Sequence, residues 1–321
     1  MNQMTSTSRR GRIAALTLLT ALAPLVWGTT YAVTSEMLPA GHPLFAGTLR
    51  ALPAGLVAVA IGTALPRGAW WWRSATLGIL NIGLFFPMLF VAAERLPGGV
   101  AGTLGAISPL IVAVVGVPLL GERMSAWRIG WGIAGVVGVG LVVLGPTARL
   151  DFVGIAAGLT GASSMAIGVT LMKRWGRPQG VSSVSLVGWQ LTAGGLFLVP
   201  VTLIVEGAPP AIDGRAAIGY GWLGLAGGLV AYSIFFSGVA KLPLASVTPL
   251  SLLSPMTAAT VGVVVLGESL STPQIAGLAI ALASVLAGQV PPPARSRSIG
   301  TATAPPLGSI SPQPCPTPLG R

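Results

Sequence analysis

Charged and metal-binding residues are scarce in this chain. Only 8% of its 321 residues are charged, whereas a soluble domain carries about 25%. A single histidine, His42, and a single cysteine, Cys315, are present, so the chain cannot form an internal disulfide and lacks the ligand clusters that hold zinc. None of its seven carboxylates lies near the centre of an apolar stretch, where a buried acid and base pair would work. We therefore expect neither an enzyme nor a metal site nor a cofactor.

Apolar residues dominate the composition instead, at 53% of the chain with a mean hydropathy of +0.82. Hydrocarbon offers no partner for a free backbone group, so such spans are helical, and barrel strands would alternate polar and apolar residues. Stretches long enough to cross about 30 Å of hydrocarbon predict an all-α integral membrane protein with ten transmembrane helices. We place them at 13–34, 44–65, 74–93, 98–120, 127–145, 152–172, 183–205, 216–240, 244–266 and 274–290.

Basic residues are unevenly divided between the connections. With the N-terminus inside, the inner segments would carry fourteen Lys and Arg residues and the outer loops three, with Arg50 left inside a helix. Positively charged loops tend to stay in the cytoplasm, so we expect a multi-pass protein of the plasma membrane with both termini cytoplasmic. The net charge of +11 is then a signal of topology, and we expect no binding to nucleic acid.

One sequence motif occurs twice. Ser108-Pro109 followed by Gly121-Glu122 returns 146 residues later as Ser254-Pro255 followed by Gly267-Glu268. The earlier parts of the two copies align more weakly, at an offset of 140, which matches Arg50 with Gln190 and Gly28 with Gly168. The chain therefore consists of two related halves.

The two copies differ in charge. Arg123 and Arg128 of the first copy become Ser269 and Gln274 in the second. Five crossings per half would turn the second copy over and make its inner loops outer loops, where arginine is disfavoured. The sequence thus predicts two inverted repeats, the plan of many secondary transporters.

These repeats define the expected domains. The first repeat covers 13–145 and the second 152–290, with five helices each. Residues 1–12 form a cytoplasmic tail, and residues 291–321, rich in Pro, Ser, Thr and Gly, form a second one. Both tails lack apolar periodicity, so we expect them to be disordered.

The motifs of the first half resemble a known family. Val26-Trp27-Gly28, Arg50, and the segment from Gly102-Thr103 through Ser108-Pro109 to Gly121-Glu122-Arg123 are similar to the EamA repeat, in the ten-helix branch of the drug/metabolite transporter superfamily. The resemblance covers about residues 14–289. It implies that helices 1, 3, 4, 6, 8 and 9 surround a central path, that helices 2 and 7 open and close it, and that helices 5 and 10 are scaffold. The second copy departs from the pattern, with Ile167-Gly168 and Gln190 in place of Trp-Gly and Arg.

Arg50 is the strongest polar candidate for a residue that lines the path. A charge within a span is costly and usually has a partner or a function. It lies about two turns from the expected outer end of its helix, so gating or substrate contact competes with structural pairing or snorkelling to the interface. Because it is a lone cation, a cavity for phosphorylated sugars is disfavoured.

The remaining path candidates are aromatic, amide and hydroxyl residues. Three pairs at i, i+4 spacing share a helix face, although such pairs more often serve packing than ligand contact. Together with Gln190 they suit a small, weakly polar or zwitterionic metabolite, with an amino acid as the best single guess. The pairs are Trp27 and Tyr31, Asn81 and Phe85, and Tyr232 and Phe236.

Two further features bear on movement. Proline frees a carbonyl one turn earlier and bends a helix, so we interpret Ser108-Pro109 and Ser254-Pro255 as hinges at the path, against the alternative of static kinks. Glu94 ends a helix that should line the path. It is the candidate for gating or coupling, against the alternative of a solvated or capped helix end.

The predicted function is a secondary transporter that exports a small metabolite, such as an amino acid, by alternating access. The alternative is a non-transporting membrane scaffold or sensor that keeps the carrier fold. The expected partners are a small-molecule substrate and the lipid bilayer. The sequence leaves open a homodimer, the substrate's identity, the direction of transport and the coupling ion.

Overall fold

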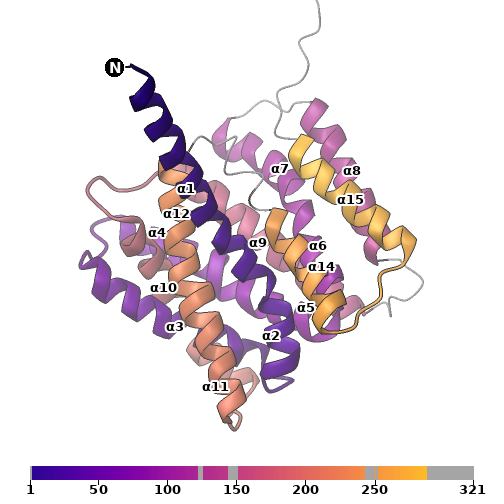
Figure 1. Cartoon of the computed structure of the whole chain (residues 1–321). Coiled ribbons are helices and arrows are strands. Elements are labelled where there is room, and N and C mark those ends of the chain that lie inside the picture. Colours follow the sequence, from indigo (N-terminus) through magenta and orange to yellow (C-terminus); the bar gives the residue numbers. More distant parts are fainter. Residues whose placement is uncertain (1, 122–125, 144–150, 243–249, 251, 288–321) are drawn as a thin grey trace, which may run out of the picture. The chain divides into compact units, whose positions relative to one another are not determined.

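The computed structural model describes residues 2–121, 126–143, 151–242, 250 and 252–287. Every regular element in these ranges is a helix, and they contain no strand (Figure 1). The predicted all-helical fold class is therefore confirmed. Glu122, Arg123 and the expected C-terminal tail at 291–321 lie outside the described residues.

Helices of the first half run from the N-terminus to residue 143. They are α1 (Asn2–Gly28), α2 (Thr30–Met37), α3 (Pro43–Gly62), α4 (Trp70–Gly78), η1 (Ile79–Leu84), α5 (Phe85–Arg95), α6 (Gly98–Thr103), η2 (Leu104–Ile107), α7 (Ser108–Leu120) and α8 (Ala126–Val143).

Helices of the second half follow from residue 152. They are α9 (Phe152–Trp175), α10 (Ser183–Val205), α11 (Gly214–Gly221), η3 (Trp222–Val230), α12 (Ala231–Lys241), α14 (Leu253–Val265) and α15 (Thr272–Ala287). In each half one π-helical segment, η1 or η3, interrupts an otherwise continuous helix.

The helices are long and apolar enough for a multi-pass membrane protein. Six of the described helical segments meet the requirements of length and composition for a span, and a seventh does if Gly98–Val112 and Val114–Leu120, which meet at a bend of 41°, form one crossing. Three shorter apolar helices accompany them, at Ile129–Val142, Leu253–Val265 and Thr272–Ala287. The six are Ile13–Met37, Pro43–Gly62, Trp70–Arg95, Phe152–Trp175, Ser183–Val205 and Gly214–Phe235.

The N-terminal end differs from the expectation of a disordered tail. Helix α1 begins at Asn2 and continues without a break into the first apolar stretch. Once the apolar stretch is helical, each further residue extends an existing hydrogen-bond ladder and avoids the cost of a new nucleus.

Carboxylates cap helix ends across the two halves. The backbone N–H groups of Leu44 and Phe45 donate to the carboxylate of Glu206 at 2.6 and 2.8 Å, and that of Gly98 donates to Glu268 at 2.8 Å. Free N–H groups at a helix N-terminus favour a negative group. Glu206 and Glu268 therefore cap helix N-termini, and both residues tie the second half to the first.

The contact between α3 and α10 repeats itself when the two halves are exchanged. Gly55 of α3 faces the backbone of Thr192, and Gly195 of α10 faces the backbone of Leu52. At the offset of 140, residue 55 corresponds to 195 and residue 52 to 192. Exchanging the two halves therefore converts each contact into the other, as at a two-fold interface. Glycine is needed at both positions because a Cβ would come within 2.8 Å of the opposite backbone.

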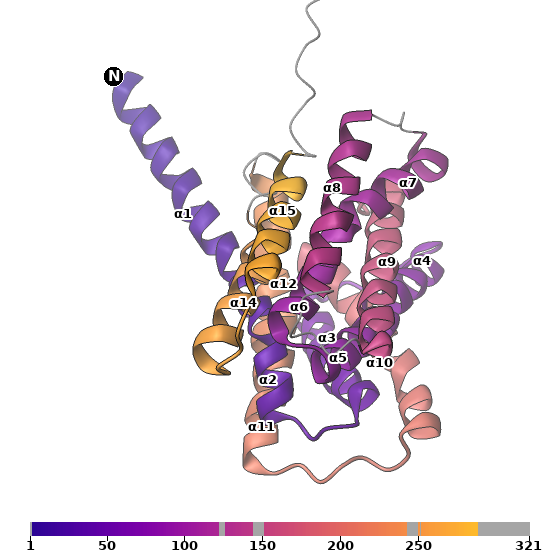
Figure 2. The same ribbon diagram turned by 90° about the vertical axis from the view of Figure 1, so that its right-hand side faces the viewer.

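Helices α8 and α15 meet in the same way, and they lie side by side in Figures 1 and 2. A Cβ on Gly138 would lie 2.7 Å from the backbone of Ala281, and one on Gly135 would lie 2.6 Å from the hydroxyl of Ser284. At the offset of 146, residue 135 corresponds to 281 and residue 138 to 284. Exchanging the halves again converts each contact into the other, so this second interface also relates equivalent parts of the halves.

The Ser-Pro motifs stand where helices begin. Ser108 starts α7 directly after the 3-10 segment η2, and Ser254 is the second residue of α14, which follows residues in 3-10 conformation. Proline is tolerated in the first turn because its missing N–H has no intrahelical partner there. In both halves the Ser-Pro motif thus lies at a 3-10 to α junction, and its interpretation as a hinge stays a prediction.

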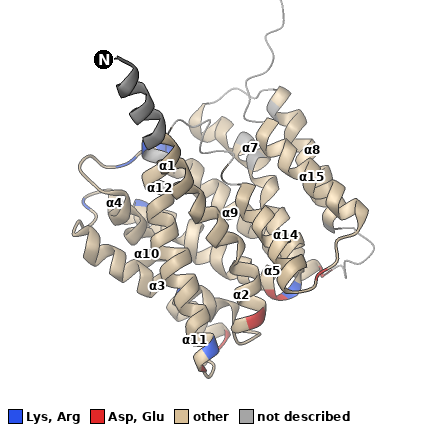
Figure 3. Cartoon of the chain, in the orientation of Figure 1, with Lys and Arg blue, Asp and Glu red and all other residues tan. Residues whose placement is uncertain are grey.

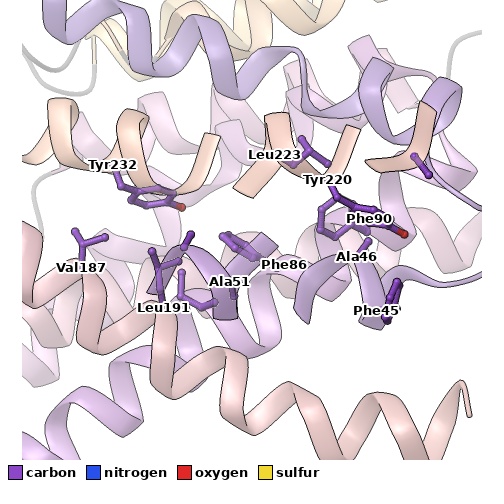
Figure 4. Packing of buried hydrophobic residues seen from close by; sticks show 13 residues of the cluster. Phe45, Ala46, Ala51, Phe86, Phe90, Val187, Leu191, Tyr220, Leu223 and Tyr232 are labelled. Atoms are coloured by element: carbon purple, nitrogen blue, oxygen red, sulfur yellow. The ribbon is translucent and has the colours of Figure 1, made fainter. Parts of the chain in front are cut away.

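A buried aromatic and aliphatic cluster fills the centre of the bundle (Figure 4). Phe86 and Phe90 are fully buried, and Tyr220 packs its ring edge-on against Phe45 at 5.7 Å. Trp27, Leu49 and Phe85 pack around this cluster. It joins α3, α5 and η3, and it surrounds the candidate site described next.

Candidate functional site

Two π-helical segments shape the centre of the molecule. η1 spans Ile79–Leu84, and η3 spans Trp222–Val230, whose last six residues correspond to η1 at the offset of 146. A π segment adds a residue to a helical turn and is frequent at functional sites. The two segments bring Asn81 and Gly227, another matched pair, to the middle of the bundle.

Arg50 is buried on α3, with 2% of its surface exposed. Its guanidinium carbon lies 4.5 Å from the centre of the Phe86 ring and 5.8 Å from that of Phe90. Nε and Nη1 are buried and have no hydrogen-bond partner within the described part of the chain. Snorkelling to the membrane interface is therefore wrong for this side chain. The aromatic cluster of α5 encloses it and holds its charge inside the bundle.

Three of the predicted aromatic residues gather around this arginine. Tyr31 and Tyr232 lie close enough to Arg50 to interact with it electrostatically. Trp27 donates from Nε1 to the carbonyl of Gly227 at 2.9 Å, and its ring centre lies 4.8 Å from that of Tyr232. Helices α1, α2 and α12 thus each contribute one ring to the surroundings of Arg50 and Gly227.

Asn81 and Gln190 form an amide pair. Asn81 Nδ2 donates to Gln190 Oε1 at 2.8 Å, and Gln190 Nε2 donates to the carbonyl of Leu186 at 3.3 Å. Both residues line a cavity of about 30 Å³ together with Tyr232, Met172 and aliphatic side chains, which is room for about one water molecule. The buried Oδ1 of Asn81 has no hydrogen-bond partner among the described residues.

Gly168 makes room for this amide. A Cβ at Gly168 would overlap Oδ1 of Asn81. Gly28, its counterpart, also lies close to another helix, α14, where a Cβ would come 2.6 Å from the carbonyl oxygen of Ser254. The aligned Gly28 and Gly168 thus both permit a close approach, each to a predicted path residue.

The second Ser-Pro motif borders the first half. A Cβ on Gly102 would lie 3.5 Å from the ring of Tyr31 and 3.6 Å from Cα of Pro255. Both residues therefore pack against α6 at Gly102. Ser254 and Pro255 therefore lie beside α1 and α6. Ser108 begins α7. The side chain of Pro109 lies outside the described residues.

Glu94 lies apart from this group, at the end of α5. The backbone of Gly41 hydrogen-bonds to it, and Glu206 and His42 are its charged or polar neighbours. Described acidic residues gather at this end of the bundle, opposite the N-terminus (Figure 3). Glu94 is half-buried, and its role in gating or coupling stays a prediction.

An ion pair lies at the same end of the bundle. Arg95 Nη1 lies 3.1 Å from Oδ2 of Asp151, and Asp151 Oδ1 accepts from the backbone N–H of Gly154 at 2.8 Å. The hydrogen bond from Gly154, followed by the Arg95 guanidinium, lowers the pKa of the Asp151 carboxyl. Asp151 is the N-cap of α9, so it fixes where the second half begins.

The sequence prediction missed Phe86 and Phe90, which contact Arg50 most directly. We expected Phe85 on the same face as Asn81, because i and i+4 coincide on an α-helix. The π segment between them changes the phase, so Phe86 takes the buried position and Phe85 is only partly buried. The i, i+4 spacing of Phe86 and Phe90 was the signal that could have found them. The side chain of Phe236 lies outside the described residues, and Phe235 contacts Trp27 instead.

Comparison with known proteins gives a consistent result. The model of the EamA-like transporter family matches residues 15–144 and again residues 152–287. The chain is 40% identical over 264 residues to protein PecM of Dickeya dadantii, covering 82% of this chain and 89% of that protein. It is 26% identical over 257 residues to the uncharacterized inner membrane transporter YedA of Escherichia coli K12, covering 77% of this chain and 81% of the relative.

A solved structure has the same fold. It is described as a crystal structure of a protein, shares 19% sequence identity with this chain, and superimposes with a TM-score of 0.59. The match covers 86% of this chain and 96% of the other. At this identity the likeness concerns the fold alone.

Proposed function

This chain belongs to the EamA-like transporter family, within the drug/metabolite transporter superfamily, and we propose that it is a secondary carrier that exports a small metabolite by alternating access. An amino acid is the substrate class favoured by the mixed aromatic and amide lining. Relatives named as transporters point to a non-enzymatic role.

We propose ten crossings arranged as two inverted repeats. Support comes from the equivalent contacts, Gly55 with Thr192 and Gly195 with Leu52, which a two-fold relation between the halves requires. Further support comes from the matched π segments and the matched 3-10 to α junctions. Inverted repeats place a substrate site near the midplane between the halves.

The proposed setting is the plasma membrane, with both termini in the cytoplasm. The excess of Lys and Arg on the predicted inner side supports this orientation. The described acidic residues lie at the opposite end of the bundle, together with Arg95 and Arg215 (Figure 3).

The observation that carries the function is the polar group enclosed between the halves. Arg50 from the first half and Gln190 from the second lie deep in the bundle, and helices from both halves supply the rings and amides around them. In a bilayer such residues belong to a substrate or ion pathway more often than to a passive scaffold. The cavity of about 30 Å³ beside Gln190 is too small for a metabolite, so substrate binding requires the halves to move.

Transport into vesicles tests this proposal. Purified protein is reconstituted into liposomes, and the movement of radiolabelled amino acids is followed in both directions. We expect saturable uptake or efflux that protein-free vesicles lack. If no solute class moved in either direction and no ligand raised the melting temperature, the scaffold or sensor alternative would replace the carrier.

A further inference from the structure

We propose that Arg50 binds the carboxylate of the transported solute, and that substrates are therefore small monocarboxylates with an apolar or aromatic body. This inference rests on the proposed carrier function. It names the substrate class that the central site would take. The basis is a comparison of the surroundings of Arg50 with those of its counterpart in the other half, Gln190.

The first step is the unsatisfied charge. An unpaired ionised group in a protein interior is strongly destabilising, and buried charges are normally paired and hydrogen-bonded. Arg50 is 2% exposed, yet its Nε and Nη1 have no hydrogen-bond partner in the described ranges. Contact with the Phe86 ring offsets part of this cost. It supplies neither a negative charge nor a hydrogen-bond acceptor in the plane of the guanidinium.

The second step is that the described carboxylates are engaged elsewhere. Each of five contacts a backbone amide or a surface arginine, and the sixth, Glu94, lies at the outer end of α5. A resident counter-ion for Arg50 is therefore missing from the described part of the chain. The five are Glu36 with Arg215, Asp151 with Gly154, Asp213 with Ala216, Glu206 with Leu44 and Phe45, and Glu268 with Gly98.

The third step is the comparison of matched positions. Gln190 is the counterpart of Arg50, and Asn81 is the counterpart of Gly227. Gln190 receives its hydrogen bond from Asn81 at 2.8 Å. Arg50 faces Gly227 instead, where a Cβ would lie 3.6 Å from Nη2. The side chain that would complete the pair in the first half is thus absent, and a ligand group can take its place.

The chemistry of the arginine selects that group. A guanidinium binds a carboxylate through charge-assisted hydrogen bonds, often two in parallel. A lone cation neutralises one negative charge, and a second carboxylate would remain unpaired in the bundle. The Trp27, Tyr232 and Phe86 rings around the site provide apolar faces for the rest of the solute. Arg50 is 2% exposed and does not line the small cavity beside Gln190, so the ligand reaches it when the halves move apart.

Matched ligands test the inference without knowledge of the natural substrate. The probes are phenylacetate and L-phenylalanine, each beside its amide, with sodium chloride at equal ionic strength as the control for small anions. Thermal unfolding of the purified protein in detergent is measured for the wild type, Arg50→Gln, Arg50→Lys and the control Arg95→Gln, which removes an arginine at the membrane surface. We expect at least one carboxylate to raise the melting temperature of the wild type and its amide to raise it less.

The variants then locate the effect. Arg50→Gln should weaken binding of the stabilising carboxylate by about tenfold or more, since a charge-assisted hydrogen bond is lost. Arg50→Lys should recover part of the affinity, and Arg95→Gln should leave it unchanged. The lysine variant also guards against misfolding of the glutamine variant, because it keeps the charge at the same position.

Three outcomes would overturn the proposal: no carboxylate exceeds its amide, chloride stabilises as strongly, or Arg50→Gln binds carboxylates as well as the wild type. Vesicle transport separates this failure from failure of the carrier function. Movement of neutral or cationic solutes without discrimination for carboxylates would sink the role of Arg50 and leave the carrier standing. Absence of all transport would remove the carrier itself.

Discussion

Arg50 in the first half and Gln190 in the second occupy matching positions, yet their surroundings are opposite. Gln190 has its amide partner in Asn81, and Gly168 leaves space for that pair. Arg50 faces Gly227 and has buried N–H groups without partners among the described residues. The backbone around the two positions is similar in both halves. Single side chains decide whether the buried polar group at each position has a hydrogen-bond partner. The two halves thus share a scaffold, and they differ at these positions in whether a buried polar side chain has a partner among the described residues.

The most severe test supplies the missing partner. Gly227→Asp should place a carboxylate against Arg50, because a Cβ there lies 3.6 Å from Nη2 and meets no nearer atom. We expect affinity for carboxylates to fall by about a hundredfold or more, with the melting temperature unchanged or raised. Gly227→Ala is the matched control, since it adds the Cβ without the charge. Full binding and transport by the aspartate variant would show that Arg50 does not meet the solute.

The next test removes the charge itself. Arg50→Met keeps an unbranched side chain but no longer buries an unpaired cation, so we expect the free energy of unfolding without ligand to rise by about 1–4 kcal/mol. Carboxylate binding should be lost at the same time. Chemical unfolding in mixed detergent micelles measures the first effect. A less stable methionine variant would mean that Arg50 is satisfied in the native protein.

A third test disturbs the hydrogen-bonded pair of Asn81 and Gln190 through the glycine that makes room for it. Gly168→Ala would push a methyl group into Asn81, so we expect a loss of about 1–3 kcal/mol from overpacking and a weakened bond to Gln190. Gly221→Ala is the control, because a Cβ there meets nothing within 4 Å. Thermal unfolding of the two variants side by side gives the difference. If the two variants were equally stable, the close approach of α9 to η1 would be contradicted.

The smallest expected effect concerns the start of the second half. The folded-state pKa of Asp151 lies below its ordinary value of 3.8, so its contribution to stability is present above that value and is lost as the pH falls through the folded pKa. Asp151→Asn should therefore flatten the acid side of the stability profile slightly and change nothing at pH 7 or above beyond a constant offset. Because the group is exposed to solvent, high salt should reduce the effect further. Melting temperatures between pH 2 and 7 at two salt concentrations provide the measurement.

Much of the fold followed from patterns along the chain. The offset of 140 matched Gly28 with Gly168 and Arg50 with Gln190, and the structure places both glycines at close approaches to predicted path residues. The internal repeat likewise matched Asn81 with Gly227, and the structure places this pair in the two matched π segments. These features could be predicted because they depend on local periodicity and on positions that both copies share.

The site itself was predicted less completely. Phe85 was expected beside Asn81, but Phe86 and Phe90 take the buried positions because a π segment changes the helical phase. The choice of a π turn depends on how η1 packs against α9 and α10, and single-sequence spacing carries no trace of it. Arg50 was placed correctly in its helix, yet its burial depended on rings from another helix.

The amino-acid sequence by itself determined the apolar helices, the internal repeat and the asymmetric distribution of charge, because each of these is a property of residues near one another along the chain or of one copy set beside the other. Only the tertiary structure decided which side chains meet. It set Gly227 opposite Arg50 and Asn81 opposite Gln190, pairs separated by more than a hundred residues. Whether a buried polar group has a partner depends on such long-range packing, and that is why the unsatisfied arginine emerges in the folded protein alone.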